Sequence, residues 1–131
     1  MSHTATVRVI YGDTDQMGVV YYGNFLRYFE VGRAEWLRAR GHTYRNFEAG
    51  GHILPVVEAQ VRYLAPARYD DLLAIETSTA EVKNVSVKFI YRVRRDTELL
   101  AHGFTVHACL SASDQKPRRF PPNIHALLKL D

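Results

Sequence analysis

Two aspartates separated by one residue, Asp13 and Asp15, lie in a loop directly before a predicted helix. The N–H groups in the first turn of a helix lack internal partners and carry the positive end of the helix dipole, so they can bind an oxyanion. A carboxylate beside them can attack a carbonyl carbon or deprotonate a water molecule. Because Asp-Thr-Asp before a glycine is also ordinary turn chemistry, the pair by itself leaves catalysis and loop structure both open.

The segments on either side must hold this loop in place. β-Branched residues alternate with small or polar ones over residues 4–11, which predicts a first strand. The loop spans residues 12–23, and Asn24 is a plausible N-cap, with a boundary one or two residues earlier left open. Apolar residues then recur at helical spacing, namely Phe25, Leu26, Phe29, Gly32, Ala34, Trp36 and Leu37. We expect Gly41 to end this helix, and Gly32 to allow close approach of a neighbouring element.

The rest of the chain is mostly strands. A short helical turn is expected over residues 43–48, a tail helix over 123–129, and strands over 53–64, 72–82, 85–94 and 98–111. One strand, one long helix and four consecutive strands predict an α+β fold, an antiparallel five-stranded sheet wrapped around a central helix. Such a sheet leaves edge strands, which the pairing of subunits would cover.

The segment from Asp13 to Phe25 resembles the signature of the 4-hydroxybenzoyl-CoA thioesterase-like family, D-x-D-x-x-G-x-V-[YW]-[YH]-x-x-[YF], and fills each of its positions. This family includes the thioesterases associated with the Tol-Pal system. Weaker similarity continues through Glu30, Arg33 and Glu35, residues 66–71 and residues 116–121. The resemblance therefore covers nearly the whole chain. It implies the hotdog fold, hydrolysis of thioesters, and a homodimer or homotetramer with its sites at the dimer interface.

The resemblance also implies roles for residues of the loop. Asp15 matches the family's catalytic acid, either as a nucleophile that forms a mixed anhydride or as a general base for water. Tyr22 matches a position that is Tyr or His, where the backbone N–H polarises the thioester carbonyl. Where the family has His, the side chain is thought to assist catalysis, and Tyr22 departs from that version. Asp13 is expected to support the loop by Asx-type hydrogen bonds.

Further residues are predicted to position the substrate. Gly18 and Gly23 would permit the turns of the loop and close approach of a ligand, and Asn24 would cap or orient the loop. The phosphates of coenzyme A need basic side chains, for which the candidates are Arg62, Lys88, Arg118 and Arg119. Each of them can equally be solvated surface charge. The sequence leaves three locations for Glu58, which is on the same strand as Arg62: the pocket, the subunit interface or the solvent-exposed face of the strand.

The composition limits the class of protein. With 131 residues, 47% hydrophobic and 24% charged, the chain has the composition of one soluble globular domain spanning residues 1–131. The net charge of +3 suits a phosphate-bearing ligand, and no basic motif of a nucleic-acid binder is present. The single cysteine, Cys109, excludes an internal disulfide and indicates a cytoplasmic protein. Neither an export signal nor a run long enough to span a membrane is evident.

We expect no metal and no cofactor, because the six histidines show no ligand spacing and Cys109 has no activating neighbour in the sequence. The sequence thus predicts an acyl-CoA thioesterase. Three alternatives remain: a thioesterase acting on acyl carrier protein, a hotdog hydratase or dehydratase, and a non-catalytic acyl-binding module or scaffold in an envelope-associated complex. The D-x-D-x-x-G arrangement argues against the hydratase, and the intact Asp15 argues against a binding module.

Overall fold

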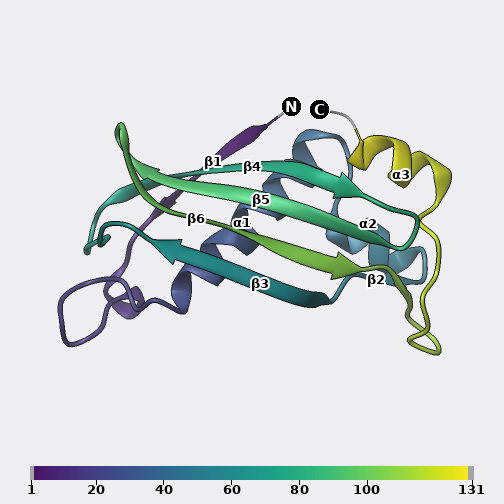
Figure 1. Cartoon of the computed structure of the whole chain (residues 1–131), viewed down its shortest axis with the longest axis horizontal. Helices are drawn as coiled ribbons and strands as arrows, with labels where there is room; N and C mark the ends of the chain where they lie inside the picture. Colours follow the sequence, from purple (N-terminus) through teal and green to yellow (C-terminus); the bar gives the residue numbers. More distant parts are fainter. Residues whose placement is uncertain (1, 130–131) are drawn as a thin grey trace.

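A five-stranded antiparallel sheet packs against one long helix in the computed structural model, which describes residues 2–129 (Figure 1). The sheet has the strand order β1-β4-β5-β6-β3, with β1 (His3–Arg8), β3 (Val56–Tyr63), β4 (Leu72–Val82), β5 (Ser86–Arg95) and β6 (Glu98–Ala108). The helix α1 (Asn24–Ala39) crosses one face of the sheet. This arrangement confirms the predicted α+β hotdog fold.

Shorter elements close the ends of the sheet. They are the 3-10 turn η1 (Tyr11–Asp13), α2 (Tyr44–Ala49), the paired strands β2 (His52–Ile53) and β7 (Leu110–Ser111), and α3 (Pro122–Leu128). The predictions for three strands were too long. The first ends at Arg8 because the chain turns into η1, and the strand predicted over 53–64 is divided before Val56, where Pro55 has no N–H to donate. The strand predicted over 98–111 is divided at Cys109, whose N–H bonds to the carbonyl of Val85 instead.

Both ends of α1 follow from local sequence. The helix begins at Asn24 with Gly23 in the capping position, one residue earlier than the cap first considered. At the other end Gly41 has a φ of +76°, a conformation that glycine adopts without strain. The N–H groups of Gly41 and His42 then donate to the carbonyls of Arg38 and Leu37, at 3.0 and 3.1 Å. This pair of bonds is the Schellman motif, and it confirms Gly41 as the helix stop.

Gly32 brings α1 close to the sheet. A Cβ at this position would lie 2.4 Å from Thr77 Oγ1 and 2.8 Å from Ile75 Cγ2, distances at which atoms overlap. The predicted close approach is therefore confirmed, and β4 is the neighbouring element. On either side of Gly32 along α1, Phe29 stacks on Tyr91 at 4.2 Å between ring centroids, and Trp36 meets Phe89 edge-on. These rings form the centre of the core.

Strand β3 forms one edge of the sheet and is exposed along nearly its whole length. Among residues 2–129 it pairs with β6 alone, and a Cβ added at Gly103 of β6 would lie 2.0 Å from the carbonyl oxygen of Gln60. An edge strand with unpaired backbone groups on its outer side is a template for pairing with another chain. Within residues 2–129 no helix has the length and apolar character needed to cross a membrane.

Candidate active site

Asp13 is buried beneath the loop and fully occupied by hydrogen bonds. The residue is only 4% exposed. Oδ2 accepts from the Tyr28 hydroxyl at 2.9 Å and from the N–H of Ile10 at 3.2 Å, while Oδ1 pairs with Arg27. Burial and the bond to Asp13 both raise the pKa of Tyr28, so its hydroxyl stays a donor. These contacts support the predicted structural role of Asp13.

Asp15 is held firmly but keeps one oxygen open. The N–H of Met17 donates to Oδ1 at 2.9 Å, and the N–H of Gly18 donates to the Asp15 carbonyl at 3.0 Å. Gly18 has a φ of +80°, which is the turn conformation predicted for it. Among residues 2–129, no hydrogen-bond donor reaches Oδ2 of Asp15. The half-buried carboxylate is therefore oriented by its own loop, and its Oδ2 atom is free to accept a hydrogen bond or to act as a nucleophile.

The loop that carries Asp15 leads into the N-terminus of α1, where two N–H groups are unpaired within residues 2–129. The N–H of Tyr21 bonds to the carbonyl of Asp13, and that of Asn24 to the carbonyl of Tyr21. In the part of the chain that the structure describes, the N–H groups of Tyr22 and Gly23 have no acceptor. They satisfy the requirement for an oxyanion site, because they are free donors at the positive end of a helix.

The glycine and asparagine of this turn act differently from what the sequence predicts. Gly23 has an ordinary helical φ of −64°, so the prediction that the turn needs its flexibility was wrong. A Cβ there would instead lie 3.0 Å from the Tyr21 ring. Asn24 is not the cap, but its side-chain amide donates to the Asp13 carbonyl at 2.8 Å. It thus orients the loop, as the second of its predicted roles requires.

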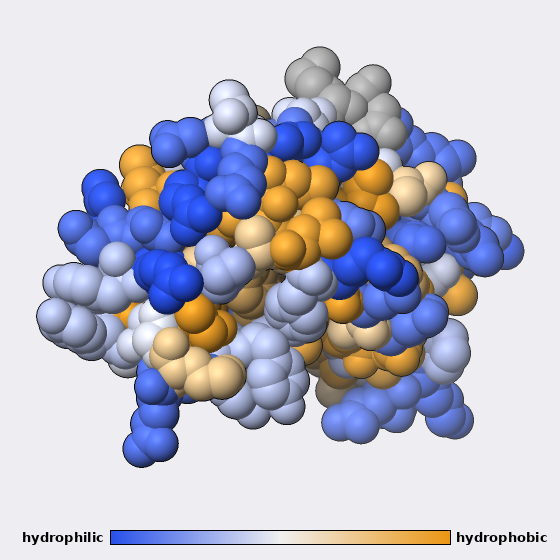
Figure 2. Space-filling model, turned by 60° about the vertical axis from the view of Figure 1, so that its left-hand side comes forward, coloured by the Kyte–Doolittle hydropathy of each residue, from blue (hydrophilic) through white to orange (hydrophobic). Residues whose placement is uncertain are grey.

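Tyr63 is a residue of this site that sequence reasoning missed. Its hydroxyl donates to the carbonyl of Tyr22 at 2.8 Å, and its ring contacts Phe25 edge-on. The two tyrosines are 41 residues apart in the chain, and no local pattern connects them. The Tyr22 side chain is 62% exposed and tilts against Tyr21, so it lies at the open side of the site. Met17 and Leu64 are among the exposed large apolar side chains. Figure 2 shows apolar patches interspersed with polar side chains on the face that it presents.

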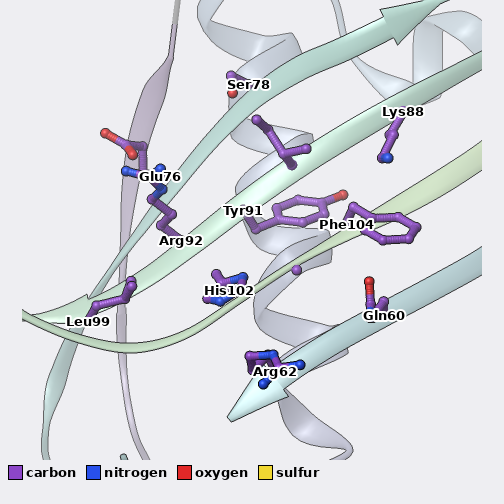
Figure 3. A pocket seen from close by; sticks show the side chains of 12 residues that line it. Gln60, Arg62, Glu76, Ser78, Lys88, Tyr91, Arg92, Leu99, His102 and Phe104 are labelled. Carbon is purple, nitrogen blue, oxygen red and sulfur yellow. The ribbon is translucent and has the colours of Figure 1, made fainter. Parts of the chain in front are cut away.

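The four predicted phosphate-binding residues do not join the loop within one chain. Arg62 and Lys88 lie on the face of the sheet away from α1, where they line a groove of about 570 Å³ together with Arg92 and His102 (Figure 3). Glu58 points to this same outer face, because it alternates along β3 with the inward Val61. Arg118 and Arg119 follow β7, at the end of the molecule opposite the loop (Figure 1).

The other groups considered for chemistry are unsuited to it. Burial raises the pKa of the Cys109 thiol to about 11, with the charge of Arg118 opposing, so the thiol is protonated near neutrality. Among residues 2–129, no cluster of three or more His, Cys, Asp or Glu side chains could hold a metal ion. Asp15 and the neighbouring backbone N–H groups therefore stay the predicted catalytic groups.

A sheet folded around one long helix is the architecture of the hotdog fold. Residues 9–128 match the family model of the thioesterase-like superfamily, and the chain belongs to this family. The resemblance recognised in the sequence is thereby confirmed.

Individual relatives agree with this assignment. The acyl-CoA thioesterase YbgC of Haemophilus influenzae is 36% identical over 121 residues, which cover 92% of this chain and 89% of that protein. The crystal structure of the hypothetical protein TT1821 from Thermus thermophilus aligns with a TM-score of 0.92 and 37% identity, covering 98% of this chain and 95% of that one. A DHNA-CoA thioesterase from Staphylococcus aureus aligns with a TM-score of 0.93 and 27% identity, covering 96% of this chain and 87% of that one.

Proposed function

We propose that the protein is an acyl-CoA thioesterase in which water cleaves the thioester to a free acid and coenzyme A. One observation carries the catalytic part of the proposal: Asp15 keeps an open carboxylate oxygen in the loop that leads into α1, and the N-terminus of α1 has two N–H groups that are unpaired within residues 2–129. Coenzyme A as the leaving group is supported by the relatives, since the Haemophilus protein is named an acyl-CoA thioesterase and aligns over nearly the whole chain.

In the proposed reaction the thioester carbonyl accepts hydrogen bonds from the N–H groups of Tyr22 and Gly23. These donors stabilise the negative charge that develops on the carbonyl oxygen. Oδ2 of Asp15 then attacks the carbonyl carbon, the C–S bond breaks, and coenzyme A leaves as the thiolate. Water hydrolyses the resulting mixed anhydride and restores Asp15. In the second version of the mechanism, Asp15 removes a proton from the attacking water and no anhydride forms.

A second copy of the chain would complete the substrate site. Antiparallel pairing of β3 with its own copy creates a two-fold axis, so each copy is turned end for end relative to the other. The end that carries Arg118 and Arg119 is then beside the other copy's loop, although the two lie at opposite ends of one chain (Figure 1). A homodimer, or a homotetramer built from it, would thus bring basic residues to the phosphates of coenzyme A. We place this single-domain enzyme in the cytoplasm, which suits its one free cysteine.

The test is thiol release from a panel of acyl-CoA esters by wild type and by Asp15→Asn. We expect kcat to fall by about 10²–10⁴-fold in the variant, with acyl-CoA binding retained in a calorimetric titration. Activity unchanged by the substitution would contradict the role of Asp15. No turnover of any ester by the wild type would favour an acyl-carrier substrate, which acylated carrier protein in the same assay would test, or a binding role.

A further inference from the structure

A second cavity lies along the flank of α1 and is separate from the loop. It encloses about 240 Å³ and is lined by Glu30, Arg33 and Leu37 of α1, by Leu54, and by Phe89 and His107 on the inner face of the sheet. Its walls are thus largely apolar, with one cation, Arg33, among them. A cavity of this kind, with few polar groups, is the usual form of a small-molecule site.

The cavity is in line with the proposed reaction centre. Positions 26, 30, 33 and 37 share one stripe of a helix, and Leu26 at the start of this stripe is 40% exposed. With a rise of 1.5 Å per residue, Glu30 is about 9 Å along the axis from Asn24. An acyl group whose carbonyl is bound at the N-terminus of α1 can therefore run along this stripe, past Leu26, and end near Arg33.

A buried chain of hydrogen bonds lies behind Arg33. Nδ1 of His107 is 3.0 Å from the carbonyl oxygen of Leu54, Nε2 is 2.8 Å from Thr105 Oγ1, and Thr105 Oγ1 is 2.6 Å from the Tyr91 hydroxyl. Burial lowers the pKa of His107 to about 4, with the charge of Arg33 adding to the effect and the bond to Leu54 opposing it. His107 is therefore neutral near pH 7.

The direction of every bond in this chain follows from the Leu54 carbonyl. A carbonyl only accepts, so Nδ1 of His107 carries the proton and Nε2 accepts from Thr105. The Thr105 oxygen in turn accepts from the Tyr91 hydroxyl. The Tyr91 oxygen is left as an acceptor, and the charge of Arg33 opposes the burial that raises the pKa of Tyr91. All donors of this hydrogen-bonded chain are used within it, and the Tyr91 oxygen stays available to accept from the Arg33 guanidinium.

Arg33 keeps donors for a ligand. Its side chain is only 18% exposed, and within residues 2–129 the carboxylate paired with it is that of Glu30, 3.7 Å away and beyond hydrogen-bond distance. The Glu30 side chain is itself 71% exposed. An ion pair of this length and exposure is weak and easily displaced. The cavity consequently offers a fixed cation, which suits a group that accepts hydrogen bonds and carries negative charge.

We propose that Arg33 selects acyl groups that end in a carboxylate, the half-thioesters of dicarboxylic acids, over acyl groups that end in a methyl. Tyr91, Thr105 and His107 act as positioning residues for its guanidinium. The inference rests on the proposed thioesterase function and deepens it by naming the class of acyl group. Arg33 is here a specificity residue, distant from the bond that breaks.

The test compares kcat/KM for adipoyl-CoA and hexanoyl-CoA, which have the same carbon chain and differ in the terminal group. We expect the wild type to prefer adipoyl-CoA and Arg33→Gln to lower that preference at least about tenfold, the value of a charge-assisted hydrogen bond. Tyr91→Phe should lower the preference to an intermediate level, because Arg33 remains but the acceptor that we propose for it is removed. Each ratio is taken within one preparation, so a partly unfolded variant gives the same ratio as a fully folded one.

Glu30→Gln is the matched control. It removes the competing carboxylate and leaves Arg33 in place, so the preference for adipoyl-CoA should persist or rise. Equal preference in wild type and Arg33→Gln, with both esters hydrolysed, would overturn the inference and leave the proposed function standing. Hydrolysis of neither ester, nor of any other in the acyl-CoA panel, would overturn the function itself. A different preference would overturn the inference but not the function. This result would be a preference for 4-hydroxybenzoyl-CoA over benzoyl-CoA that needs both Arg33 and Glu30, with no preference for adipoyl-CoA, and it would indicate a hydroxyl-binding site.

Discussion

Two polar clusters contact α1, and they differ in what they leave unpaired. In the buried cluster of Tyr91, Thr105 and His107, every side-chain donor has an acceptor, the last of which is the carbonyl of Leu54, and all three residues are almost fully buried. In the loop before α1, one oxygen of Asp15 and the N–H groups of Tyr22 and Gly23 have none within residues 2–129. The first cluster can position a neighbour, whereas the second keeps unpaired groups for the catalysis that we propose.

The same contrast divides the two aspartates of the loop. Asp13 accepts from Tyr28, Ile10 and Arg27, whereas Asp15 accepts through one oxygen from Met17. The two carboxylates are chemically identical and two positions apart in the chain. Their surroundings alone assign one to structure and leave the other available for chemistry.

The strongest test of this contrast compares the stability that each aspartate contributes. Asp13→Ala should destabilise the protein by about 3 kcal/mol, because the buried Tyr28 hydroxyl and the N–H of Ile10 lose their acceptor. Asp15→Ala should cost less than about 1 kcal/mol, since it removes one bond at the surface of the loop. Urea unfolding of both variants measures the difference. Equal losses of stability would show that the two carboxylates share the structural role.

A pH titration sharpens the comparison at the buried cluster. The pKa of His107 is lowered from 6.5 to about 4 in the folded protein. Between pH 6.5 and pH 4, His107 therefore binds a proton in the unfolded chain but stays neutral in the folded protein. Stability from this group is therefore complete above pH 6.5 and is lost as the pH falls toward 4. Between pH 7 and pH 5 the loss should be about 2 kcal/mol.

The control for this titration is His107→Gln, which removes the titrating group. The variant should lose less stability than the wild type over the same interval, by those same 2 kcal/mol or so. Urea unfolding of the two proteins at each pH isolates His107 from the other groups that titrate there. Parallel pH profiles would mean that His107 is charged in the folded state, and the hydrogen-bond directions derived from it would be wrong.

The smallest effect is expected at the junction of loop and sheet. Tyr63→Phe removes the bond from its hydroxyl to the carbonyl of Tyr22 and leaves the ring in contact with Phe25. Because the lost bond is exposed, the variant should lose about 1 kcal/mol or less of stability and less than about fivefold in kcat/KM. Urea unfolding measures the loss of stability, and thiol-release kinetics measures the loss of kcat/KM. A much larger loss in kcat would place the Tyr63 hydroxyl among the groups that act on the substrate.

Sequence reasoning reached the fold because the signals it used are local. The strand Leu72–Val82 has the predicted bounds, and Gly41 ends α1 as predicted, because alternation and a left-handed glycine are properties of a few neighbouring residues. The same reasoning missed Tyr63, since its partner Tyr22 is distant in the chain. It also missed the chain from Tyr91 to His107, whose order depends on strand register. The roles of Asp15 and of the basic residues stay predictions until they are measured.

Gly103 has a consequence for any library of variants made from this protein. It is a glycine in a sheet, beside a strand that is exposed along nearly its whole length, and exposure alone would mark this region as tolerant. The carbonyl of Gln60 nevertheless occupies the space that any side chain would need. Position 103 should therefore reject every other amino acid as firmly as a core position does. A randomisation scheme that keeps only buried side chains constant would vary position 103 and produce variants that do not fold.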